Sequence, residues 1–193
     1  MIYPSTLDLT ILQDSTFEQD LIITESARPV TINDATNVFT SQCHKFTAGT
    51  RVAFSADNDA ELPCGLTGGV AYYVIADGLT GSSFKVSATA GGAEIDVSIV
   101  STGATYKVGK VLDLTSYSFD ADIRQAAGGA DVASFTCTKL DATSGTLRLS
   151  MTPATTLGIT VGTYAWDLKL KTGQKSFFYA KGNVTVESTI SRD

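Results

Sequence analysis

The sequence contains little of what metal centres and disulfide scaffolds are built from. Its 193 residues include one histidine and three cysteines, Cys43, Cys64 and Cys137. These cysteines are too few and too irregularly spaced for a disulfide framework or a zinc ribbon. A bridge between Cys43 and Cys64 stays open, because the redox compartment decides it. Cys137 lies in an alternating segment and is predicted to be a small buried apolar residue.

The chain also lacks a positive charge excess and a long apolar run. Its formal net charge is −6 and its lysines are scattered, whereas phosphate neutralisation requires a basic stripe. We therefore expect no nucleic-acid partner. No apolar stretch approaches the roughly 20 residues of a membrane helix. The start, Met1–Pro4, has neither the basic nor the apolar region of a secretion signal. We expect a soluble protein that is made in the cytoplasm.

Short strands and turns fill the chain instead. The 17 glycines accompany many Thr, Ser and Val residues, and no long segment has helical periodicity. The clearest pattern is 163–171, where Tyr164, Trp166, Leu168 and Leu170 alternate with polar or small residues. Thr172-Gly173 then supplies a tight reversal into a second strand. These features predict an all-β protein whose single tryptophan anchors a core between two sheets.

The character of the sequence changes twice along the chain. Residues 34–108 are richer in Gly, Ala, Ser and Thr, with short apolar bursts separated by turns, which indicates a small barrel or sandwich. Residues 1–33 and 109–193 share a more regular alternation, and neither segment alone has enough strands to close two sheets. We predict one discontinuous β-sandwich over 1–33 and 109–193 with an inserted β-domain over 34–108. Two tandem domains are the alternative.

Several motifs of the outer segments resemble the immunoglobulin-like amino-terminal domain of phage proteins of the baseplate upper protein type. The resemblance rests on their order and spacing, since each is weak alone. The motifs are Leu7–Phe17, Asp113–Tyr117 (with Ser116 where glycine is usual), Ala121–Arg124, Gly162–Leu168 and Gly182–Val186.

The middle segment is similar to a module of phage tail and fibre proteins. Its matching residues are His44-Lys-Phe46, Gly49, Val52, Phe54, Leu62–Leu66, Tyr72–Ile75 and Phe84–Val86. Together the two resemblances cover nearly the entire chain. They imply an immunoglobulin-like sandwich interrupted by a small β-barrel or sandwich, in a virion component without enzymatic activity. Its expected partners are other virion proteins and copies of itself in a symmetric assembly.

The resemblance favours a position in the tail or baseplate, where the protein would act through many individually weak contacts. A capsid decoration protein or a head–tail connecting protein is the first alternative, because it uses the same kind of fold. A carbohydrate-binding module for the host surface is the second. Its expected sign is a groove of exposed aromatic side chains, Tyr72, Tyr73 and Tyr106.

Residues that could carry chemistry have simpler interpretations. Cys43 and His44 are neighbours on the chain, and neighbours on a strand point to opposite faces, so they form no nucleophilic pair. The acidic loop 57–61 lacks the spacing of a calcium loop. Asp120 and Asp122 continue into Arg124, which indicates an outward charged row rather than a carboxylate pair for hydrolysis. We predict no catalytic residue, no cofactor and no metal.

Overall fold

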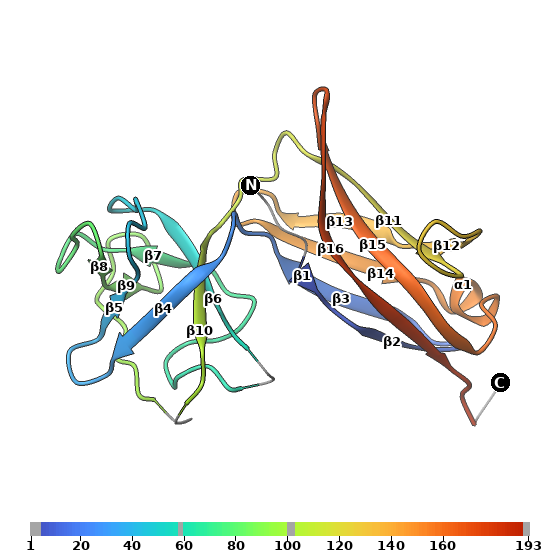
Figure 1. Ribbon diagram of the computed structural model, residues 1–193, viewed down its shortest axis with the longest axis horizontal. Helices are drawn as coiled ribbons and strands as arrows, with labels where there is room; N and C mark the ends of the chain where they lie inside the picture. Colours follow the sequence, from blue (N-terminus) through green and yellow to red (C-terminus); the bar gives the residue numbers. More distant parts are fainter. Residues whose placement is uncertain (1–4, 58–59, 100–102, 191–193) are drawn as a thin grey trace. The chain divides into compact units, whose positions relative to one another are not determined.

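The computed structural model describes residues 5–57, 60–99 and 103–190 and contains two compact units (Figure 1). Unit 1 comprises Met1–Leu21 and Asp113–Asp193, and unit 2 comprises Ile22–Leu112. Regular structure in the described ranges consists of strands and one short helix, α1 (Pro153–Leu157). The prediction of an all-β protein is confirmed.

Unit 1 is built from two sheets. The six-stranded sheet has the order β1-β16-β15-β11-β12, with β2 also paired to β16, and the three-stranded sheet has the order β13-β14-β3. The strands of the first are β1 (Ser5–Thr6), β2 (Leu9–Leu12), β11 (Ser118–Arg124), β12 (Asp131–Ser134), β15 (Gly162–Thr172) and β16 (Lys175–Glu187). Those of the second are β3 (Phe17–Ile22), β13 (Thr136–Asp141) and β14 (Thr146–Met151).

The two sheets of unit 1 pack through the predicted alternating side chains. Trp166, which is 3% exposed, lies on the inner face of β15. Phe135 joins the layers: its ring lies 5.8 Å from the Trp166 ring in an edge-on arrangement and 5.5 Å from Phe17 of β3. The other buried apolar side chains include Leu168 and Leu170 of β15, Leu147, Leu149 and Met151 of β14, and Ile11, Ala121, Ile123, Val184 and Val186.

The strand order of unit 1 is that of the immunoglobulin fold. Strands β3, β14 and β13 occupy the positions lettered B, E and D, and β16, β15, β11 and β12 those lettered G, F, C and C′. The fold's tyrosine corner is also present, since the Tyr164 hydroxyl, near the start of β15, donates to the Thr160 carbonyl oxygen at 2.7 Å. Unit 2 therefore interrupts the sandwich between its B and C strands.

Strands β15 and β16 form the predicted hairpin. Thr172 pairs with Lys175, so the turn is Gly173-Gln174, and Gly173 takes a φ of 54°. The second strand of the hairpin, β16, is continuous from Lys175 to Glu187. A register shift lies opposite Leu168 and Lys169. Such a β-bulge resets the alternation of side chains along the strand.

Unit 2 is a single rolled sheet with the order β8-β5-β4-β10-β6-β7-β9. Its core contains a set of buried aromatic and β-branched side chains, among them Phe39, Phe54, Phe84, Val52 and Val108. The strands are β4 (Arg28–Asn33), β5 (Val38–Thr40), β6 (Arg51–Ala56), β7 (Tyr72–Val74), β8 (Ser83–Phe84), β9 (Val86–Ser87) and β10 (Tyr106–Lys110).

The rolled sheet closes almost completely at Lys85. Strands β8 and β9 are the two ends of the sheet order, yet Lys85 alone separates them in the sequence. The extended segment 83–87 therefore pairs with β5 through its first half and with β7 through its second. This arrangement is a small, nearly closed barrel, in which few backbone N–H and C=O groups at a sheet edge lack a hydrogen-bonding strand.

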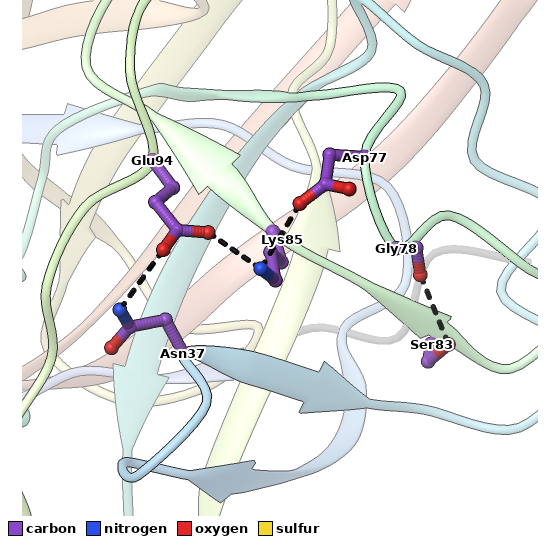
Figure 2. Close-up of polar contacts among 6 residues, drawn as sticks. All are labelled: Asn37, Asp77, Gly78, Ser83, Lys85 and Glu94. Carbon is purple, nitrogen blue, oxygen red and sulfur yellow. Dashed lines mark hydrogen bonds and ion pairs between the residues drawn. The ribbon is translucent and has the colours of Figure 1, made fainter.

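Ion pairs hold the region around this closure (Figure 2). The Lys85 Nζ lies 2.7 Å from a Glu94 carboxylate oxygen and 3.0 Å from one of Asp77. The second Glu94 oxygen accepts from the Asn37 amide at 3.5 Å. These hydrogen bonds, that to Glu94 first, raise the pKa of Lys85, and the bond to Lys85 lowers the pKa of Glu94.

The boundary of the middle segment differs from the predicted one. Residues up to 33 were assigned to the sandwich, but β4 pairs with β10 and β5 of the barrel. Unit 2 accordingly begins at Ile22 and ends at Leu112 rather than spanning residues 34–108. Alternation within β4 carries no information about which strand is its partner.

Candidate functional site

The tyrosines expected to line an exposed groove do not form one. Tyr72 and Tyr106 are only 4% and 5% exposed and belong to the barrel core. The Tyr72 hydroxyl accepts from the Thr67 backbone N–H at 2.7 Å. Tyr73 is half-buried, with the Arg51 guanidinium 5.6 Å from the centre of its ring. The predicted aromatic surface is therefore wrong, because on these strands the face that carries Tyr72 and Tyr106 is the barrel interior.

His44 is a structural residue rather than half of a nucleophilic pair. It is 4% exposed, its Nδ1 accepts from the Phe46 backbone N–H at 2.9 Å, and its ring packs against Phe46 and Phe84. Cys43 and Cys64 are exposed and unbridged. Cys137 is half-buried, and burial, aided by nearby aspartates, raises the pKa of its thiol to about 11. Burial therefore disfavours the reactive thiolate form of Cys137.

The acidic residues assemble no metal site in the part of the chain that is described. No three His, Cys, Asp or Glu side chains come together there in a suitable group. Of the acidic loop 57–61, Asn58 and Asp59 lie outside the described residues, and Asp57 pairs with Lys107 at 2.7 Å. No described helix has the length and apolar character that a membrane span requires.

A groove of about 450 Å³ lies on the outer face of the six-stranded sheet, between β11, β15, β16 and the turn after β11. A hollow of about 280 Å³ shares Asp122, Arg124, Asp167 and Phe178 with it, so we treat the two as one outer groove. The charged side chains that line it, Asp122, Arg124, Asp167 and Lys181, project from the face opposite to the one that carries Leu168. Rigid strands therefore position every charged group in the groove.

Two carboxylates face each other in this groove. Asp122 and Asp167 are directly opposite in the β11–β15 pairing, where side chains approach closely. Asp122 accepts from the Ser134 hydroxyl at 2.7 Å, and Arg124, 3.9 Å away, is held more tightly by Asp131 at 2.9 Å. Among the described residues, no side chain hydrogen-bonds or ion-pairs with Asp167. Its carboxylate is therefore available to a partner.

The environment of Asp167 disfavours its charge. Burial raises the pKa of the Asp167 carboxyl, and the negative charge of Asp122 adds to the rise. Arg124 and Lys169 act in the opposite direction. The groove is mixed in charge, because Arg124, Lys169 and Lys181 line it beside Asp122 and Asp167, and Lys181 is directly opposite Asp167 in the β15–β16 pairing.

Apolar side chains are exposed on the same face of the sheet. Phe178 is 51% exposed at the groove, where the Lys169 ammonium lies 5.4 Å from its ring centre. Leu12 and Val161 are 45% and 52% exposed. Leu12 pairs with Glu187 and Gly162 with Val186, so Leu12 and Val161 are two strands apart at one end of the sheet. The face thus combines apolar and charged surface.

The sequence predicted the outward row of Asp120, Asp122 and Arg124, and the structure has it. Asp120 pairs with Lys171 across the strands. The groove itself was missed. Asp167 was recognised only as the polar side of the tryptophan strand, and its position opposite Asp122 depends on a register between residues about 45 apart in the chain. Phe178 lies on the outer face because it pairs with Lys169, next to the bulge in β16.

Comparison with known proteins gives no assignment. A scan of the chain against models of protein families finds no match. A search of curated proteins finds no match either.

Proposed function

We propose that the protein is a non-enzymatic structural component of a bacteriophage virion, in the tail or baseplate. In this proposal it binds other virion proteins and copies of itself, and repetition of the contacts in a symmetric assembly makes weak contacts strong. The sequence resemblance of the sandwich and of the barrel to phage baseplate and tail proteins supports the location.

The outer face of the six-stranded sheet is the observation that supports a docking role. It presents Phe178 at the charged outer groove and Leu12 farther along the sheet, both more than 40% exposed. Aromatic and arginine side chains with a polar surround are typical of protein interfaces. The partner segment that fits this groove combines an apolar contact for Phe178 with polar groups for the mixed charges of Asp122, Asp167, Arg124 and Lys181.

The location is tested by finding the protein in intact particles, by immunogold labelling or by cryo-electron microscopy of purified virions. We expect signal at the tail or baseplate. Signal confined to the capsid lattice or the neck would overturn the tail assignment in favour of the decoration or connecting role. Absence from purified particles would overturn the structural proposal altogether.

The docking face is tested by complementation with tagged variants. Phe178→Asp places a carboxylate in the outer groove and is expected to lower incorporation into particles at least tenfold. The matched control is Leu140→Asp, because Leu140 is 47% exposed on β13 of the other sheet. Equal incorporation of both variants would refute the groove as the docking face. Thermal unfolding of each purified variant checks that the fold is retained.

A further inference from the structure

The barrel has a cavity of its own, and its chemistry differs from that of the outer groove of the sandwich. It measures about 280 Å³ and lies between the start of β4, the loop before β6 and the end of β10. Its lining residues are Glu25, Ser26, Arg28, His44, Lys45, Phe46 and Lys110. From it we infer an oxyanion-binding site: a pocket for a carboxylate, sulfate or phosphate group carried on a larger ligand.

The charge of the cavity opposes that of the chain. Arg28, Lys45 and Lys110 supply three positive charges against the single carboxylate of Glu25, in a protein whose formal net charge is −6. Glu25 pairs with Lys110 at 3.2 Å, on the exposed side. Arg28 and Lys45 have no carboxylate partner among the described residues. An entering oxyanion therefore meets uncompensated positive charge.

Arg28 is held in place by neutral groups. Its Nη1 donates to the Cys43 carbonyl oxygen at 2.7 Å and, more weakly, to that of Gln42 at 3.4 Å. Carbonyl oxygens orient the guanidinium without cancelling its charge. A guanidinium has five N–H donors in a fixed plane, so donors remain for bidentate contact with an oxyanion. Arg28 is thus positioned in advance for such a ligand.

The loop that presents Lys45 is built around the buried His44. Cys43 and Lys45 take φ values of 52° and 58°, a left-handed conformation that costs roughly 1 kcal/mol or more for a residue with a side chain. His44 holds this conformation: its Nδ1 accepts from the Phe46 N–H, and its ring lies 4.7 Å from Phe46. Strained backbone maintained by a buried anchor is characteristic of binding sites. Here it directs an exposed lysine to the cavity rim.

The test is a titration of the full chain with inorganic phosphate and with glucuronate, followed by amide chemical shifts. We expect saturable shifts at residues 43–46 and around Arg28 with at least one of the two. A stronger response to phosphate indicates a phosphate-bearing ligand, and a stronger response to glucuronate an acidic glycan. No saturation with either at tens of millimolar would overturn the site, as would shifts centred elsewhere.

Lys45→Ser is the matched variant, because Lys45 is exposed and its loss leaves the His44 anchor intact. We expect its dissociation constant to rise about tenfold, as for loss of one charge-assisted hydrogen bond. Lys107→Ser changes the net charge equally in the same barrel, outside the cavity, and is expected to leave binding unchanged. Equal weakening by both variants would show general charge attraction and overturn the site.

Discussion

Trp166 and Gly182 depend on each other inside the sandwich. They are directly opposite in the β15–β16 pairing, and the indole Nε1 donates to the Leu7 carbonyl oxygen at 2.8 Å. A β-carbon at position 182 would collide with that same oxygen. Because the contact is with backbone, the amino-terminal segment would have to move to admit any side chain.

Gly182→Ala should therefore destabilise unit 1. We expect the free energy of unfolding to fall by roughly 1–3 kcal/mol, the usual cost of forcing atoms into a filled core. Urea unfolding followed by Trp166 fluorescence measures it. Gly158→Ala is the control in the same unit: a β-carbon there stays at least 3.4 Å from its neighbours and the backbone φ is −73°, so its stability should stay within roughly 0.5 kcal/mol of the parent. Equal stability of the two variants would contradict the packing described.

Asp167 is predicted to cost the protein stability at neutral pH. Its pKa is raised in the folded state, first by burial and then by Asp122. A carboxyl whose pKa is higher when folded destabilises the fold above that pKa and has no effect well below the pKa of a free aspartate. Asp167→Asn should thus raise the free energy of unfolding at neutral pH by roughly a few tenths of a kcal/mol, which is measured as a higher melting temperature. The gain should vanish in acid.

Asp120→Asn is the matched control for that measurement, because Asp120 lies on the same face of the sheet and is paired with Lys171. Its removal should give no gain in stability at neutral pH. A gain as large as that of Asp167→Asn would mean that general charge reduction, rather than the groove, is responsible. The Asp167→Asn substitution is expected to weaken docking while it stabilises the fold, as is common when a binding residue is neutralised.

At the scale of elements, periodicity predicted strands well and partners poorly. The alternation of Trp166, Leu168 and Leu170 gave the buried face of β15. Pairing is decided by contacts distant in sequence, so β4 was assigned to the wrong unit. Tyr72 and Tyr73 are neighbours, so alternation is equally compatible with either one facing the core. Only the rolling of the sheet decides that Tyr72 is the buried one.

The closure of the barrel at Lys85 gives a pH-dependent prediction. The pKa of Glu94 is lowered, chiefly by the hydrogen bond from Lys85. Its contribution to stability is then present above the pKa of a free glutamate and is lost as the pH falls through the lowered value. Glu94→Gln should lower the melting temperature of the barrel at neutral pH, and the difference should shrink on acidification.

Circular dichroism melts across the acidic range test this prediction. Glu61→Gln serves as the control, since Glu61 is exposed and has no ion pair in the described part of the chain. The contribution of Lys85 has the opposite pH dependence, because its pKa is raised in the folded state. The stabilisation is fully present below the pKa of a free lysine and is lost as the pH rises through the raised value. Identical pH profiles for the two glutamine variants would refute a role for the closure in stability.

At the scale of the whole molecule, each unit has a core of its own. The buried set around Phe39 and Phe84 belongs to residues 30–108, and the set around Trp166 belongs to unit 1. The chain passes between the units twice, after Leu21 and before Asp113. A domain with its own core and few chain crossings is expected to tolerate excision of its neighbour.

Two deletions distinguish the observed boundary from the one that alternation suggested. Joining Leu21 to Asp113 through a short Gly-Ser linker should leave a sandwich that unfolds cooperatively, with buried Trp166 fluorescence. Removing residues 34–108 instead leaves β4 without β5 and without most of β10, which exposes Val30, 4% exposed in the intact barrel. That protein should aggregate or melt at a lower temperature. If it proved as stable as the first deletion, β4 would belong to the sandwich; if neither folded, unit 1 would need unit 2 to complete its core.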